Sequence, residues 1–220
     1  MVTEDAPTWA HALAGRMLVF EGPDGSGKST QLRRFVDAVR TTGLEVVEVR
    51  EPGGTEVGEK IRRVLLDHLD EEMSPTCEML LYMASRAQLV AQRIEPALAR
   101  GALVVADRFV SSTLAYQGAA GGVSTEAIRA VAEIACAGLE PDLVLIFDVD
   151  EETAARRLSP LLDRMEAKGR AFHARVRAGY HEQARAEPGR HLIIDARLGE
   201  EEVWRSLLSA LGSHPLTSSR

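Results

Sequence analysis

The chain has 220 residues, of which 45% are hydrophobic and 27% are charged, and its formal net charge is −7. This length and composition are typical of one globular domain with a substantial core, and the acidic balance argues against a general nucleic-acid binder. Two cysteines far apart in sequence are too few for a disulfide framework, and no apolar stretch approaches the length of a membrane span. We therefore expect a cytoplasmic protein that binds no membrane and no nucleic acid.

The N-terminal residues carry Glu4 and Asp5 and lack the basic start and apolar run of a signal peptide. We expect residues 1–15 to form a flexible extension, with Trp9 and Leu13 docking on the body of the protein.

Short apolar runs alternate with amphipathic helical patterns along the rest of the chain. The runs typical of buried strands cover residues 17–21, 45–50, 102–106, 143–149 and 191–195. The helical patterns cover residues 28–42, 56–67, 76–100, 124–138, 151–158, 171–186 and 199–211. This alternation predicts an α/β fold, a parallel sheet with helices on both faces, in one domain over 16–212 with a C-terminal tail at 213–220. Ligands of such sheets bind beyond the carboxyl ends of the strands.

A glycine-rich turn follows the first predicted strand. Its spacing fits the phosphate-binding pattern G-x-x-x-x-G-K-[ST], which lies between a strand and a helix as that motif requires. Glycines let backbone N–H groups approach phosphate oxygens, while the lysine reaches the outer phosphates and the hydroxyl ligates Mg²⁺. The predicted ATP-binding residues are Gly22, Pro23, Asp24, Gly25, Ser26, Gly27, Lys28, Ser29 and Thr30.

Charged residues also follow the second and third predicted strands. Arg50-Glu51-Pro52 precedes two glycines, an arrangement that a plain surface turn seldom needs. Asp107-Arg108 follows the third strand, where the carboxylate is well placed to hold Mg²⁺ through water and the arginine can fork onto a phosphate. Taken alone, this pair is equally compatible with a structural ion pair.

Tyr82 and Arg86 are four residues apart in the helical pattern over 76–100, so they share one helix face. An aromatic ring beside a planar donor group is a platform for a nucleobase. On local evidence alone, a core tyrosine and a surface arginine explain the pattern at least as well.

Taken together, the segments GPDGSGKST, REPGGT, SRAQL and DRFVSSTLAYQG resemble the bacterial thymidylate kinases. Later segments, PDLVLIFDV, DRME and AFHARVRAGY, extend the resemblance over nearly the whole chain. The resemblance implies a five-stranded parallel sheet wrapped by helices, a homodimer, and ATP-dependent phosphorylation of dTMP to dTDP with Mg²⁺.

The resemblance also implies residue roles. Lys28, Arg108 and Asp107 are expected to be catalytic, and Ser29, Asp107 and Glu51 to hold Mg²⁺, mostly through water. The residues expected to bind dTMP are Asp24 on the 3′-hydroxyl, Arg50, Arg62 and Arg108 on the phosphate, Glu51 positioning metal and water beside it, Pro52 beneath the sugar, Tyr82 stacked on thymine, Arg86, Thr113 and Gln117 on its polar edge, and Tyr116 against the deoxyribose.

A charged stretch after Ser159-Pro160 predicts a mobile lid over about residues 156–170. The phosphate-binding loop carries no arginine, so the resemblance assigns a catalytic arginine to the lid. Arg164 aligns well and Arg157 less well, and the lid is shortened relative to the family. A solvated charged loop is the alternative interpretation of both arginines.

Two other functions remain open at this stage. A kinase for a different nucleotide or nucleoside would share the loop, and a monophosphate panel would separate it from a dTMP kinase. A non-enzymatic nucleotide-binding switch or scaffold would use the loop for binding alone, although the chain supplies residues for a second substrate.

Overall fold

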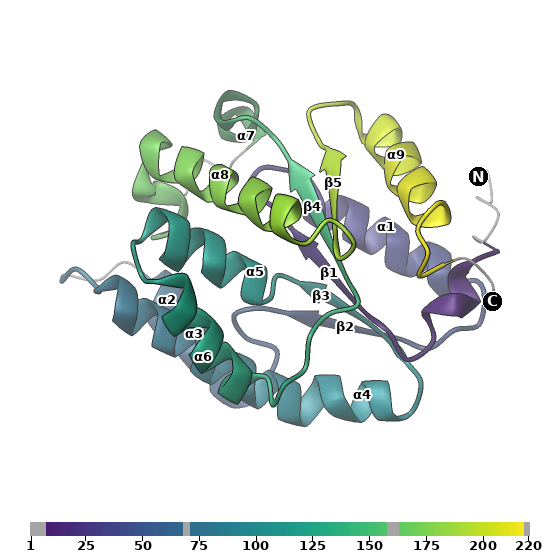
Figure 1. The fold of residues 1–220 in the computed structure, drawn as a ribbon, viewed down its shortest axis with the longest axis horizontal. Coiled ribbons are helices and arrows are strands. Elements are labelled where there is room, and N and C mark those ends of the chain that lie inside the picture. The colour runs from purple at the N-terminus through teal and green to yellow at the C-terminus, as the bar shows by residue number, and fades with distance from the viewer. Residues whose placement is uncertain (1–7, 68–70, 158–162, 218–220) are drawn as a thin grey trace.

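The computed structural model describes residues 8–67, 71–157 and 163–217. Its described residues form one parallel sheet of five strands in the order β2-β3-β1-β4-β5 (Figure 1). The chain moves from β1 to one side for β2 and β3, and to the other side for β4 and β5. The strands are β1 (Met17–Glu21), β2 (Val46–Arg50), β3 (Leu103–Asp107), β4 (Leu143–Asp148) and β5 (His191–Asp195). The predicted fold class is confirmed, and each strand lies within one residue of its predicted bounds.

The apolar runs form strands because both faces of the sheet are covered. In β1, Leu18 and Phe20 enter the core on one face, and Met17 and Val19 enter the core on the other. All of these side chains are fully buried. A strand buried on both faces has no polar alternation, which is why the runs are almost continuously apolar.

Helical elements connect the strands and cover the sheet (Figure 1). They are η1 (Ala10–Leu13), α1 (Lys28–Arg40), α2 (Glu56–Leu66), α3 (Pro75–Leu89), η2 (Val90–Ile94), α4 (Glu95–Ala99), α5 (Val110–Thr113), η3 (Leu114–Ala120), α6 (Thr125–Ala135), α7 (Glu151–Arg157), η4 (Glu166–Lys168), α8 (Arg170–Ala186) and α9 (Glu200–Gly212).

The two faces of the sheet have separate cores. Helices α1 and α9 cover one face through Phe35 and Leu207. The other face packs against Ile94 of η2 and Val176 of α8, and α3 and α6 share a third apolar cluster farther out. Helices packed on both faces of the sheet therefore hold the strand ends that precede the candidate site.

Two regions differ from the sequence-based expectation. The single helix expected over 76–100 is divided by the π-helical segment η2 into α3 and α4. Residues 110–120 form a helix, α5 continuing into the π-helical η3, where no helix was predicted. The segment contains a glycine and β-branched residues, which have low helix propensity, so tertiary packing decides its structure.

The expected N-terminal extension belongs to the folded unit from Thr8 onward. Leu13 is fully buried, and the ring of Trp9 stacks on Phe35 of α1 at 6.5 Å between centroids. Among the described residues, no helix combines the length and apolar character that crossing a membrane would need.

Candidate active site

The glycine-rich turn after β1 packs too closely against β4 for a larger residue. Gly22 has φ of 140°, and a Cβ at this position would lie 2.5 Å from the carbonyl oxygen of Phe147. Helix α1 begins at Lys28, directly after Gly27 in the left-handed conformation. The turn therefore directs the start of α1, with its free N–H groups and positive dipole end, toward the carboxyl edge of the sheet.

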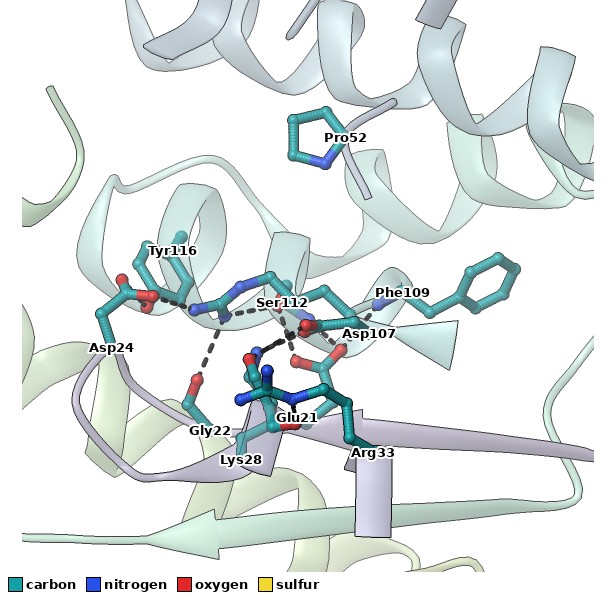
Figure 2. A network of polar contacts seen from close by, with 12 residues as sticks. Glu21, Gly22, Asp24, Lys28, Arg33, Pro52, Asp107, Phe109, Ser112 and Tyr116 are labelled. Carbon is teal, nitrogen blue, oxygen red and sulfur yellow. Dashed lines mark hydrogen bonds and ion pairs between the residues drawn. The ribbon is translucent and has the colours of Figure 1, made fainter. Parts of the chain in front are cut away.

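Asp107 at the end of β3 faces this helix start. It pairs with the Lys28 ammonium, and the Ser29 hydroxyl lies 3.3 Å from its Oδ2 (Figure 2). Burial raises the pKa of the Asp107 carboxyl, but the charges of Lys28 and Arg108 outweigh burial and hold its pKa below the usual value. A side-chain hydroxyl and an ionised carboxylate thus share one small volume at the loop mouth.

This volume fits Mg²⁺ held jointly with a phosphate. Within the described ranges, no cluster of three acidic, histidine or cysteine side chains forms a complete metal cage. Mg²⁺ does not require one, because it keeps several waters and binds through one or two protein groups plus substrate phosphates. Ser29 and Asp107 supply such groups, whereas both Glu51 oxygens are bound by Arg86.

Arg108 is held by contacts with the phosphate-binding loop and with the helix over 110–120. Its φ of 72° lies in the left-handed region, which a non-glycine residue adopts at a cost of about 1 kcal/mol or more. The guanidinium pairs with Asp24, donates 3.1 Å bonds to the Gly22 carbonyl and the Ser112 hydroxyl, and lies over the Tyr116 ring. Such backbone strain clusters at functional sites, which agrees with the position of Arg108 beside the phosphate-binding loop.

Glu21 at the end of β1 is a site residue that sequence reasoning missed. It is fully buried and accepts hydrogen bonds from the backbone amides of Phe109 and Ser112 and from the Ser112 hydroxyl (Figure 2). It also accepts a hydrogen bond from the Tyr180 hydroxyl at 2.8 Å. The carboxylate thereby caps the start of α5 and fixes the backbone that follows Arg108. The only signal in the sequence is that Glu21 is a single charged residue at the end of an apolar run.

A pocket of about 310 Å³ opens at this edge of the sheet. We call it the Arg108 pocket, and it brings together most of the predicted substrate residues. Its walls are Asp24, Lys28, Ser29, Arg50, Glu51, Pro52, Arg62, Leu66, Tyr82, Asp107, Arg108, Tyr116, Gln117, Asp163, Met165 and Glu166.

Three arginines give the Arg108 pocket a strongly cationic side. Arg50 is held by Glu59 of α2 at 2.8 Å, and Arg62 donates to the Pro52 carbonyl at 2.9 Å. Burial lowers the pKa of the Arg62 guanidinium, and the neighbouring charge of Arg50 lowers it further. Like charges held together in this way are relieved by an anionic ligand.

Opposite these arginines, Asp24 connects the loop to the second wall of the pocket. It accepts a hydrogen bond from the Tyr116 hydroxyl at 3.1 Å in addition to its pairing with Arg108. Burial raises the pKa of Asp24, but Arg108 and Lys28 outweigh burial, and the carboxyl stays below its usual pKa. Asp24 therefore places a carboxylate directly beside Arg108 in the pocket.

Arg86 and Thr113, which are expected on the polar edge of the base, are buried and do not line the Arg108 pocket. Arg86 is 1% exposed, and its Nε and Nη2 bind Glu51 at 2.6–3.1 Å. The same Nη2 donates to the Thr113 hydroxyl at 3.1 Å. The buried Glu51 carboxylate takes most of the donor capacity of the guanidinium, because a buried charge needs such a partner.

The two lid arginines point to different places. Arg164 donates to the Leu65 carbonyl at 2.8 Å and pairs with Glu78 of α3 at 2.7 Å. Arg157 donates to the Ala196 carbonyl at 2.8 Å and lines a second pocket of about 230 Å³. This second pocket, which we call the Arg157 pocket, is otherwise lined by Ser26, Gly27, Thr30, Gln31, Ala196, Leu198, Gly199, Glu200 and Val203. Neither guanidinium lies between Lys28 and Arg108, and the centre of the predicted lid, 158–162, falls outside the described residues.

Comparisons with known proteins agree with this arrangement. A family model described as thymidylate kinase matches residues 20–207. A thymidylate kinase of Pelotomaculum thermopropionicum is 46% identical over 90% of this chain and 93% of that protein. A thymidylate kinase of Pseudomonas fluorescens is 46% identical over 89% of this chain and 94% of that protein.

A comparison with solved structures also finds a thymidylate kinase. The crystal structure of thymidylate kinase from Ehrlichia chaffeensis superposes with a TM-score of 0.72 at 28% identity, covering 90% of this chain and 98% of that one. With the phosphate-binding loop, the cationic pocket beside it and these matches over nearly the full length, the chain belongs to the thymidylate kinase family.

Proposed function

We propose that this chain transfers the γ-phosphoryl group of ATP to dTMP, giving ADP and dTDP. The observation that carries the proposal is the lining of the Arg108 pocket, in which Arg50, Arg62 and Arg108 lie together with Asp24, Lys28 and Ser29 of the phosphate-binding loop. The loop that would bind the phosphates of the donor thus lies beside the arginines that would bind the phosphate of the acceptor, as transfer between two phosphorylated substrates requires.

On the donor side, the loop amides and Lys28 bind the outer phosphates of ATP. With ATP bound, Lys28 would exchange its Asp107 partner for phosphate oxygens, which would leave Asp107 and Ser29 available to hold Mg²⁺. The Arg157 pocket, on the other side of the loop, takes the base of the donor, with the guanidinium of Arg157 as one wall.

On the acceptor side, Arg50, Arg62 and Arg108 hold the dTMP phosphate. Tyr82 and Gln117 at the far end of the same pocket contact the base, and Asp24 with Tyr116 faces the deoxyribose. Pro52 also lines this pocket, and Figure 2 shows it apart from the polar network of Asp24, Glu21 and Ser112.

The transfer needs no covalent step on the enzyme. The attacking atom is an oxygen of the dTMP phosphate, which carries no proton as the dianion, so no general base is required. The arginines hold this oxygen in line with the γ-phosphorus and offset the repulsion between two polyanions. Ser29 and Asp107 would hold Mg²⁺, which would supply charge neutralisation on the phosphate oxygens.

Arg164 stays our candidate for the lid arginine that covers the transferred group, since Arg157 serves the donor base. For this role it must leave Glu78 when both substrates are bound. The release of Arg164 from Glu78 would then depend on the binding of both substrates.

A monophosphate panel tests the proposal directly. Purified protein with ATP and Mg²⁺ is offered dTMP, dUMP, dCMP, dAMP and dGMP in turn, and ADP release is measured. We expect the highest kcat/KM for dTMP. Brisk turnover of another monophosphate with dTMP inert would refute the assignment, and tight binding of ATP and dTMP without turnover would indicate a binding protein.

We also propose a homodimer that uses the outer face of α2, α3 and α6. Large apolar side chains are exposed on these adjacent helices: Val57 and Val64 at 48%, Leu80 at 50% and Ile134 at 83%. Apolar side chains gathered in this way are typical of an interface. Sedimentation should give a dimer, and Leu80→Glu with Ile134→Glu should give a monomer.

The cellular site of this activity is a further proposal. Both cysteines are free thiols, Cys77 exposed and Cys136 buried, as suits a reducing cytoplasm that also supplies ATP. With a net charge of −7, the chain is not expected to bind nucleic acid.

A further inference from the structure

A buried carboxylate behind the Arg108 pocket is the meeting point of three separate segments. Glu78 of α3 is 1% exposed, and it accepts a hydrogen bond from the Gln117 amide nitrogen of η3 at 2.8 Å. It also binds Arg164 at 2.7 Å and Lys168 at 3.1 Å, both from the segment that follows the lid centre. The two cations offset the cost of burying the carboxylate charge.

This contact decides which way the Gln117 amide faces. A carboxylate accepts hydrogen bonds and does not donate them, so the partner atom on Gln117 must be Nε2. The amide oxygen Oε1 is therefore directed to the other side. Gln117 is 2% exposed and lines the Arg108 pocket together with Tyr82, and among the described residues Oε1 has no hydrogen-bond partner.

A fixed, unpartnered acceptor in a pocket selects among pyrimidines. Thymine and uracil present an N–H donor at N3, whereas cytosine presents a lone pair at the same position. An acceptor facing another acceptor leaves both without a bond, and buried groups left in that state cost more than the hydrogen bond itself contributes.

We propose that Glu78 is a specificity-determining positioning residue, which locks the Gln117 amide so that the pocket accepts bases with an N3–H donor and rejects cytosine. This inference rests on the proposed function, because it takes a pyrimidine monophosphate as the acceptor. Glu78 does not touch the substrate and acts through Gln117.

The test is Glu78→Gln, which keeps the size of the side chain. The new amide can present either its oxygen or its nitrogen, so the Gln117 amide is free to turn and offer Nε2 to cytosine. We expect the ratio of kcat/KM for dTMP over dCMP to fall about tenfold, the size of one misplaced hydrogen bond. An unchanged ratio in Glu78→Gln would overturn the proposal.

Lys168→Gln is the matched control. It removes a cation from the same carboxylate and leaves the Gln117 contact in place, so it should alter lid behaviour and leave the dTMP to dCMP ratio at the wild-type value. An equal fall of the ratio in Lys168→Gln would show that any disturbance of the cluster relaxes selection, and the assigned role of Glu78 would be wrong.

Gln117→Met supplies an independent variant if Glu78→Gln folds poorly. It removes the acceptor, so the ratio should fall, and adding Glu78→Gln to Gln117→Met should lower it no further, because Glu78 acts only through the Gln117 amide. A wild-type ratio in Gln117→Met contradicts the inference. A wild-type enzyme for which dTMP is inert instead contradicts the proposed function.

Discussion

Two buried arginine–carboxylate pairs flank the Arg108 pocket, and they differ in their access to solvent. The side chains of Arg86 and Glu51 are 1% and 3% exposed, whereas those of Arg108 and Asp24 are 15% and 25% exposed. In the first pair, Glu51 contributes to the pocket wall and Arg86 lies behind it, and both side chains are almost completely shielded from solvent. The second lines the pocket, so a ligand phosphate or hydroxyl can replace either partner. Of these two similar ion pairs, Arg86–Glu51 is therefore suited to stabilising the fold and Arg108–Asp24 to binding a ligand.

The sealed pair should dominate stability. Arg86→Met leaves the Glu51 charge buried without its main partner, so we expect the free energy of unfolding to fall by about 3–5 kcal/mol. Urea denaturation measures this change. The double variant Arg86→Met with Glu51→Met should recover much of the loss, and a loss below about 1 kcal/mol in the single variant would contradict the structural role.

The accessible pair should dominate acceptor binding. Arg108→Ala is expected to raise the KM for dTMP on the order of 10²-fold, because a charge-assisted phosphate contact is lost. Its effect on the KM for ATP and on the urea midpoint should be much smaller, since Asp24 keeps Tyr116 and lies near Lys28. Equal increases in both KM values would place Arg108 outside the acceptor site.

Arg164, the proposed lid arginine, should affect the rate of phosphoryl transfer, which neither of the two pairs is expected to dominate. Arg164→Ala is expected to lower kcat about tenfold or more with little change in the KM for dTMP, because its charge acts in the transition state. Steady-state rates at saturating ATP provide the measurement. A wild-type kcat would leave Arg164 with its contacts to Glu78 and Leu65 as its only role.

The smallest expected effect concerns acid stability. Asp107 has a folded pKa below its usual value of 3.8, so its pairing with Lys28 stabilises the fold above that value and the contribution is lost as pH falls through the folded pKa. Asp107→Asn should therefore flatten the decline of unfolding free energy on acidification, by about 1 kcal/mol. Identical pH profiles for the two proteins would mean that the pair contributes nothing.

Local sequence predicted the structure correctly where a residue type is required by its backbone conformation or by burial. The spacing of Gly22, Gly27 and Lys28 is readable because the required conformations favour glycine. Apolar runs predicted the five strands for a similar reason, since burial on both faces excludes polar residues. The helix over 110–120 could not be predicted, because its stability comes from packing against α8 and from the Glu21 cap.

By itself, the sequence determined the fold class, the phosphate-binding loop and, through family resemblance, most of the predicted substrate residues that line the Arg108 pocket. The tertiary structure decided which arginine became a sealed partner of Glu51 and which one faces the pocket. It also decided where the Gln117 amide points, since Glu78 lies 39 positions away in sequence and 2.8 Å away in space. Residue identity fixes the chemistry of a group, but its partners in three dimensions fix the direction in which that chemistry is presented.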